Sequence, residues 1–336
     1  TVFNALTGLS AETGPAGGRG KTNLGVVKVP DPRVDALSAL FRPKRTTYAE
    51  VRFSDVPGTP GSTGRGLDAA TLTAMRDMDA LAQVVRGFAD PGTGEAPRPT
   101  GELADFEAEM ILADAEVVER RLARLRKGER GFPREAELLE RIGAHLESER
   151  ALRSLDLSEG EWASFSGFGF LSRKPTMVVI NVAESEAGVP LAGDVVAFAR
   201  ERAMPALALS APVEAEIAQL PPGERASFAS EMGLREPAQD RFIREAYALL
   251  DLISFFTVGP DEVRAWTIRR GTPAQGAGGK IHSDIERGFI RAEVMEHEEL
   301  LRLGTEAKVR EAGKLRLEGK EYVVKDGDVA HFRFNV

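Results

Sequence analysis

Three short fragments of the sequence carry residue types that nucleotide chemistry uses, and the first is DVPG at residues 55–58. A carboxylate such as Asp55 at the end of a strand can hold a Mg²⁺ ion through water, and Gly58 lets a backbone N–H approach a terminal phosphate. The same four residue types also form ordinary turns, so DVPG alone does not separate a phosphate site from a plain turn.

The second and third fragments are NVAE, residues 181–184, and SAP, residues 210–212. Glu184 can accept hydrogen bonds from the edge of a purine, and Asn181 can tie its loop to neighbouring segments. The short turn at Ser210 and Ala211 can offer backbone N–H groups to a base. Asn, Glu and Ser are also common helix-cap residues, which is the simpler explanation of each fragment taken alone. Together, the three fragments predict a purine-nucleotide site.

The elements that position these fragments alternate between strand and helix. TMVVINVAE (176–184) and PALALSAPVE (205–214) are short apolar runs typical of parallel strands buried on both faces, and a helix is expected after each. This alternation predicts an α/β, doubly wound sheet with its ligands at the carboxyl ends of the strands. Upstream, the pattern predicts a helix over 1–9, a strand over 24–30, a helix capped by Asp31, a strand over 48–56, a helix over 67–78 and a strand over 81–88.

Residues 102–149 change composition to Glu, Arg, Ala and Leu. Apolar side chains recur there at alternating spacings of four and three, at Ile111, Ala115, Val118, Leu122 and Leu125. The break KGERGFP (127–133) separates this helix from a second amphipathic one. The pattern predicts an antiparallel coiled-coil hairpin, and both a partner-binding role and a plain charged surface remain open for it.

The tail, residues 249–336, predicts a small α+β unit with several short strands, KIHSDIE (280–286) among them, around one helix at 297–303. Trp266 and Phe332 are expected in its core rather than as stacking platforms. Four basic residues lie around its glycine-rich loop and are candidates for contact with RNA phosphates, although paired surface charges explain them equally well; they are Arg264, Arg269, Arg270 and Lys280.

Composition excludes several other classes of protein. The 336 residues include no cysteine, which removes disulfides, thiolate metal sites and cysteine nucleophiles, and the four histidines lie far apart. A net charge of −8 argues against binding DNA through bulk charge, and sequence-specific DNA binding is not expected. No apolar run is long enough for a membrane span, and the first residues lack the pattern of a signal peptide. We expect a cytoplasmic protein.

The whole chain resembles the YchF/Obg-like ATPase family. The resemblance is carried by DVPG and by VFNALTG, GVVKVPDPRVDAL, ILADAEVVERRL, KPTMVVINVAE and SAPVEAEIAQL, and most specifically by the tail segments at 255–294 and 311–336. It implies a doubly wound P-loop NTPase domain at 1–95 and 165–248, an inserted coiled-coil hairpin at 100–160 and a C-terminal β-grasp domain of the TGS type at 249–336. It also implies slow ATP hydrolysis and association with ribosomes.

At residue level, the resemblance assigns Asp55 and Gly58 to the turn that serves Mg²⁺ and the γ-phosphate. It assigns Asn181, Val182 and Glu184 to base recognition. GTPases have Lys second and Asp last in that motif, so Val182 and the longer Glu184 favour ATP over GTP without excluding GTP. Ser210 and Ala211 complete the expected nucleotide site.

Other positions depart from the family pattern. The phosphate-binding loop G-x-x-x-x-G-K-[ST] is expected just before Thr1, and GGRGKT at 17–22 lies in the wrong context to replace it. Thr22 falls in the switch region, where its hydroxyl would complete the magnesium shell. Thr59 stands where the family carries a hydrophobic residue in place of a water-positioning glutamine, and this substitution predicts slow or partner-dependent turnover.

The sequence thus predicts an ATPase that uses Mg²⁺ and acts as a switch on the ribosome, through its large subunit or ribosomal RNA. The competing hypothesis is a scaffold that binds ribosomes or RNA without hydrolysis, with a degenerate nucleotide site.

Overall fold

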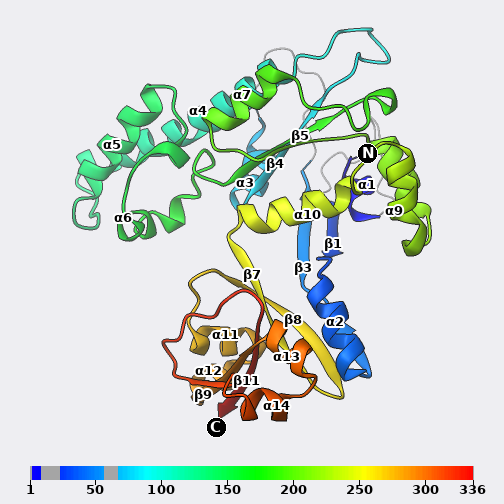
Figure 1. Ribbon diagram of the computed structural model, residues 1–336. Helices are drawn as coiled ribbons and strands as arrows, with labels where there is room; N and C mark the ends of the chain where they lie inside the picture. Colours follow the sequence, from blue (N-terminus) through cyan, green and yellow to red (C-terminus); the bar gives the residue numbers. More distant parts are fainter. Residues whose placement is uncertain (1, 9–22, 57–66, 336) are drawn as a thin grey trace. The chain divides into compact units, whose positions relative to one another are not determined.

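The computed structural model describes residues 2–8, 23–56 and 67–335, and Figure 1 shows its elements. The chain divides into two compact units. Unit 1 contains Thr1–Leu24 and Ser54–Phe242, and unit 2 contains Gly25–Phe53 and Ile243–Val336. Within the described part of the chain, no helix is both long enough and apolar enough to cross a membrane.

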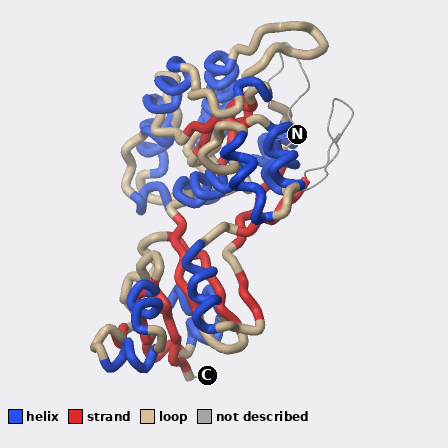
Figure 2. Tube along the Cα trace, turned by 45° about the vertical axis from the view of Figure 1, so that its right-hand side comes forward, coloured by secondary structure: helices blue, strands red, loops and turns tan. Residues whose placement is uncertain are grey.

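Unit 1 is built around a parallel sheet in the order β4-β5-β6. Its strands are β4 (Leu81–Arg86), β5 (Thr176–Asn181) and β6 (Ala206–Leu209). The first five residues of β5 are buried, as expected for a strand covered on both faces. Figure 2 shows these strands lying among helices, and the sheet confirms the α/β class for this unit.

Helices cover the sheet because their apolar sides pack on it. Leu103 and Phe198 bury against Val85, Val178 and Ile180 on one face. The helices of unit 1 are α1 (Val2–Thr7), α3 (Ala69–Arg76), α4 (Pro99–Arg126), α5 (Glu135–Glu147), α6 (Glu159–Ala163), α7 (Gly193–Glu201), α8 (Ala211–Gln219), α9 (Pro222–Glu231) and the first half of α10 (Ala238–Leu249), with short 3₁₀ turns η1 (Leu152–Ser154), η2 (Ser166–Phe168) and η3 (Glu184–Glu186).

The predicted helical hairpin is present, since α4 and α5 pack on each other. Ile111 and Val118 of the heptad pattern are buried, and Ala115, Leu122 and Leu125 are partly buried beside them. The structure adds a layer that the pattern did not predict. Residues 151–170 fold over the pair and bury Leu152, Trp162 and Phe165 in the same cluster, so the hairpin belongs to a small helical subdomain.

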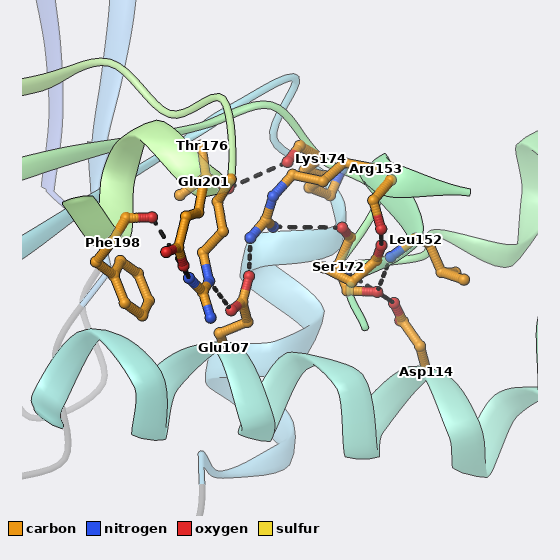
Figure 3. A network of polar contacts seen from close by, with 12 residues as sticks. Glu107, Asp114, Leu152, Arg153, Ser172, Lys174, Thr176, Phe198 and Glu201 are labelled. Carbon is orange, nitrogen blue, oxygen red and sulfur yellow. Dashed lines mark hydrogen bonds and ion pairs between the residues drawn. The ribbon is translucent and has the colours of Figure 1, made fainter. Parts of the chain in front are cut away.

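A buried polar network fastens α4 to the segment that leads into β5 (Figure 3). Asp114 is fully buried, and its carboxylate accepts hydrogen bonds from Leu171 N at 2.8 Å, Ser172 N at 2.8 Å and Ser172 Oγ at 2.6 Å. Ser172 Oγ in turn accepts from Leu152 N at 3.2 Å. Two helical turns before Asp114 on α4, Glu107 forms an ion pair with Arg153. The insertion is therefore rigidly attached where it meets the sheet.

Unit 2 contains a six-stranded sheet in the order β10-β9-β11-β7-β8-β2. Phe256, Val263 and Val329 lie in a core on one face, and Phe255 and Ile268 lie in a core on the other. The elements of unit 2 are α2 (Pro32–Phe41), β2 (Arg45–Thr47), β7 (Leu252–Thr257), β8 (Glu262–Arg269), α11 (Ala274–Ile281), α12 (Ser283–Arg287), β9 (Phe289–Glu296), α13 (His297–Leu303), α14 (Glu306–Glu311), β10 (Arg316–Glu318) and β11 (Asp328–Phe334).

Two sequence predictions differ from the structure of unit 2. KIHSDIE was expected as a strand and is helical: Ile281 packs against the core that contains Phe255, and Ile285, four residues later as on one side of a helix, is also buried. His282 separates the two helices and caps the second, its Nδ1 accepting from Asp284 N at 3.1 Å.

The segment Gly25–Phe53, which the sequence boundaries place in the domain at 1–95, packs with the tail instead. It contains β1 (Asn23–Lys28) except its first two residues, α2, β2 and most of β3 (Glu50–Asp55), and β1 pairs with β3. Asp31 caps α2 as predicted. The apolar side of α2, Val34 and Leu37, is fully buried in the unit 2 core, which explains the grouping.

Candidate functional site

The loops after β4, β5 and β6 are tied together at the carboxyl edge of the parallel sheet. Asn181, the last residue of β5, accepts a hydrogen bond at Oδ1 from Ala211 N at 3.1 Å. Val182 N donates to Leu209 O at 2.9 Å, and Gly87 N donates to Asn181 O at 2.8 Å. Two of the three predicted fragments, NVAE and SAP, therefore meet at one edge, where an α/β sheet binds its ligands.

Gly87 was not among the predicted site residues. A Cβ atom at this position would lie 2.8 Å from Ile180 Cγ2 and 3.3 Å from Val182 Cγ1. Only glycine lets the loop after β4 lie so close to the loop after β5. A glycine directly after the apolar run LAQVVR is the sequence signal that marks this close approach.

Ser210 lies at the N-terminus of α8 and is 3% exposed. Its Oγ makes no hydrogen bond to any described residue, and it does not cap the helix. Because a buried hydroxyl without a partner costs free energy, this atom is suited to a hydrogen bond with a bound molecule or a water.

Glu184 begins the short turn η3, and its side chain is exposed. Among the described residues it has no hydrogen-bond or ion-pair partner, so both carboxylate oxygens are available to a ligand. Asn181, by contrast, uses its side-chain oxygen inside the protein. Asn181 therefore holds two loops together, whereas Glu184 is available to a ligand.

The helices behind the SAP turn are braced by a buried acid. Glu214 of α8 accepts from Ala238 N at 2.9 Å, which holds the start of α10. Burial raises the pKa of the Glu214 carboxyl, and the backbone donors at Ala238 and Gln239 oppose that shift. Gln239 Nε2 donates to Leu6 O of α1 at 2.7 Å, and Arg241 Nη2 donates to Ala208 O of β6 at 2.6 Å.

Asp55 ends β3, and its Oδ2 accepts from Asn23 Nδ2 at 3.3 Å. Asn23, which sequence reasoning missed, is the first residue of β1, the strand paired with β3. Thr22, Gly58 and Thr59 lie outside the described residues.

One carboxylate with a free oxygen fits Mg²⁺, which takes one or two carboxylates and completes its shell with water and phosphate oxygens. Within the described ranges no group of three or more acids or histidines could hold a metal by itself.

The four candidate RNA contacts are used differently in unit 2. The Arg264 guanidinium lies 3.9 Å from the centre of the Trp266 ring, and Arg270 Nε pairs with Asp251 Oδ1 at 3.1 Å. Arg269 and Lys280 are exposed. Arg264 and Arg270 are therefore already engaged within the protein.

Trp266 and Phe332 pack as core residues. Trp266 stacks on buried Phe255 with a ring separation of 6.5 Å, and its Nε1 donates to Thr257 Oγ1 at 3.0 Å. Phe332 meets the same phenylalanine edge-on. This packing confirms the expectation that they are core side chains.

Comparisons with known proteins agree over the whole chain. The family model YchF-GTPase_C, described as "Protein of unknown function (DUF933)", matches residues 252–335. The chain is 40% identical to a "Ribosome-binding ATPase YchF" of Bacillus subtilis (strain 168), over 100% of this chain and 96% of the relative. A relative with the same description from Escherichia coli O157:H7 is also 40% identical, with the same coverage. The solved "Structure of the Schizosaccharomyces pombe YchF GTPase" superposes with a TM-score of 0.84 at 31% identity, covering 98% of this chain and 93% of that chain.

Proposed function

The chain belongs to the YchF family, and on that premise we propose that it is a P-loop NTPase that binds ATP with Mg²⁺, hydrolyses it slowly and associates with ribosomes. Relatives of this chain are described as ribosome-binding ATPases, and a similar solved structure is described as a GTPase. Hydrolysis of a nucleoside triphosphate is common to these descriptions, and ribosome binding comes from the description of the relatives. The choice of ATP is the finer part of the proposal.

The observation that carries the proposal is the hydrogen bond between Asn181 Oδ1 and Ala211 N. This hydrogen bond joins the loops after β5 and β6. Glu184, in the loop after β5, is exposed to solvent. The hydroxyl of Ser210 lies buried and unpartnered beside this bond, among the residues that are described. Such an arrangement supplies an exposed acceptor on one loop and a buried polar group on the neighbouring loop, the kinds of group that recognise a planar base.

Val182 and Glu184 support ATP over GTP. A guanine-specific site uses a short carboxylate to accept two N–H groups that adenine lacks in that arrangement. Glu184 is one methylene longer, and Val182 offers no long aliphatic stem to pack on the base as lysine would. Because mispaired polar groups in a binding site cost about 1–3 kcal/mol each, such a difference is enough to set a preference.

Asp55 would hold the metal, which when bound neutralises phosphate charge and orients the terminal phosphate. Asn23 keeps one oxygen of Asp55 occupied at 3.3 Å and so orients the other. The protein's own contribution is thus to position the carboxylate at the end of β3.

Equilibrium binding of ATP and GTP in the presence of Mg²⁺ tests the proposal. Glu184→Asp is expected to reduce the preference for ATP about tenfold or more. Glu186→Asp is the matched control, because Glu186 is an exposed acid of the same turn, and it should leave the ratio unchanged. Cosedimentation with ribosomes, with and without ATP, tests the partner.

Tight ATP binding with slow turnover, together with ribosome association, would support the proposal. If the wild-type protein binds ribosomes but neither nucleotide, the scaffold hypothesis is correct and the enzymatic one fails. If Glu184→Asp and Glu186→Asp behave alike, Glu184 does not read the base.

A further inference from the structure

The turn between α4 and α5 carries a strong local positive charge in this acidic protein. We call residues 120–134 the hairpin tip (Figure 1). The tip contains six arginines and one lysine against a single acid, Glu129, whereas the whole chain has a net charge of −8. A local charge of this size and opposite sign attracts polyanions even though the chain as a whole does not.

The tip is held in one conformation by an internal ion-pair cluster. Arg121 is mostly buried and pairs with buried Glu135, Nη2 donating to Oε2 at 2.9 Å, and also with Glu129. Arg121 Nη2 also donates to Arg130 O at 3.3 Å, and Glu135 Oε2 accepts from Phe132 N at 3.0 Å. These contacts hold the turn in shape, and they engage Glu129, the single acid of the tip.

Packing beneath the turn adds to this rigidity. The ring of Phe132 lies 5.2 Å from that of buried Phe165, edge to face. Gly131 lies so close to the Glu135 carboxylate that a Cβ atom at this position would clash with Oε2. The tip is therefore a preformed surface rather than a loose loop, and binding through it would cost little ordering entropy.

The outer cations of the tip are left without acidic partners. Arg126, Lys127 and Arg130 are exposed, and no described carboxylate lies within ion-pair distance of any of them. Arg120 is also exposed, and its Nε only caps the backbone oxygen of Glu116 in its own helix. Arg120 and Lys127 are seven residues apart and so share one side of α4, which extends the positive charge from the turn along the helix; Arg124, between them, pairs with Glu129 at 3.8 Å.

We propose that the hairpin tip binds the phosphate backbone of RNA, and, given the proposed association with ribosomes, that of ribosomal RNA. Guanidinium groups match phosphate oxygens in geometry and charge. A protein partner is disfavoured because protein interfaces need an apolar centre, and the leucines and the phenylalanine of the tip are turned into the helical core. Arg264 and Arg270 of the tail are engaged within the protein, whereas Arg126, Lys127 and Arg130 of the tip have no acidic partner among the described residues.

Binding of extracted ribosomal RNA and of intact ribosomes to the full-length protein tests this inference. The test variant replaces three tip cations, as Arg126→Gln, Lys127→Gln and Arg130→Gln together. A control variant with the same change in charge replaces exposed cations elsewhere, as Arg150→Gln, Arg200→Gln and Lys325→Gln together. A third variant neutralises the tail candidates, Arg269, Arg270 and Lys280.

Each phosphate contact contributes about 0.7 to the slope of log affinity against log salt for single-stranded RNA. Loss of three contacts should therefore lower the slope by about 2 and weaken RNA binding roughly 100-fold at 0.1 M salt. The control variant should bind RNA as the wild type does. All variants should keep the wild-type melting temperature and basal ATP turnover, because none of these residues lies at the nucleotide edge or in the core.

Equal RNA binding by the tip variant and the control variant overturns the inference, as does failure of the wild type to bind ribosomal RNA at 50 mM salt. Loss of ribosome binding with RNA binding intact would mean that the tip contacts a ribosomal protein, which also overturns it. If the tip variant matches the wild type while both still sediment with ribosomes and bind ATP, only this inference fails and the proposed function stands.

Discussion

Asp114 provides the sharpest test of how the helical insertion is attached. Its carboxylate is fully buried and faces three donors, with Leu171 N on Oδ1 and Ser172 N and Oγ on Oδ2. Burial raises the pKa of Asp114 above its ordinary value of 3.8, and the hydrogen bonds from Ser172 and Leu171 oppose that shift. Since every neighbour is a donor, the site requires a group that only accepts, which is the ionised form.

Asp114→Asn keeps the size of the side chain and removes one acceptor. If the amide oxygen stays with the two donors of Ser172, the new NH₂ group faces Leu171 N–H, and two buried donors lose their partners. At about 1–3 kcal/mol for each, and with partial relief from no longer burying a charge, we expect a loss of roughly 2–4 kcal/mol. For a unit of this size that corresponds to a decrease of roughly 4–16 °C in melting temperature.

Thermal unfolding, with hydrogen exchange of the Leu171 and Ser172 amides as a local readout, measures this effect. The control is Asp105→Asn, because Asp105 lies on the same helix with its side chain 76% exposed, and it should change stability by less than about 0.5 kcal/mol. A loss as small as the control's would refute the reasoning, because it would mean that Asp114 is protonated in the folded protein and that an amide replaces it at no cost.

Two further substitutions test the nucleotide edge and the hairpin tip. Gly87→Ala forces Ile180 to move, so we expect about 1–3 kcal/mol of destabilisation and weaker binding of ATP and GTP alike, measured by unfolding and by titration. Bonding to Arg121 lowers the pKa of Glu135 below its ordinary value of 4.5. A lowered folded pKa stabilises the protein above pH 4.5, and this stability is lost as the pH falls through the folded value. Glu135→Gln should therefore lower the melting temperature at pH 7 by a few degrees and converge with the wild type in acid. Glu140→Gln, at an exposed site of the same helix, should match the wild type at every pH. A constant difference between Glu135→Gln and the wild type at every pH would contradict this assignment.

Much of the local structure was predictable because it follows from spacing along the chain. The buried run at β5, the cap of Asp31 on α2 and the heptad pattern of α4 were identified from neighbouring residues alone, and the structure confirms them. The two helices at 274–281 and 283–287 were missed because a short run with alternating apolar residues is ambiguous between strand and helix until its packing partner is known.

Glu107 and Asp114 illustrate a signal that was present but not used. They are seven residues apart on α4 and lie on the same side of the helix as Ile111 and Val118. A charged residue on this side of the helix is buried, so it needs a polar or charged partner. Arg153 and Ser172, which lie 46 and 58 residues further along the chain, turned out to be those partners.

The residue types at the candidate site, and the order in which they follow their strands, are properties of the sequence, as is the concentration of positive charge at residues 120–134. Tertiary structure decided which of them act outward. In the folded protein the Asn181 side chain bonds to Ala211, whereas Glu184 is exposed. Arg121 pairs with Glu135, whereas Arg126 has no acidic partner among the described residues. The physical reason is that hydrogen bonds and ion pairs form between residues far apart in the chain, and their partners exist only once the sheet and the hairpin have closed.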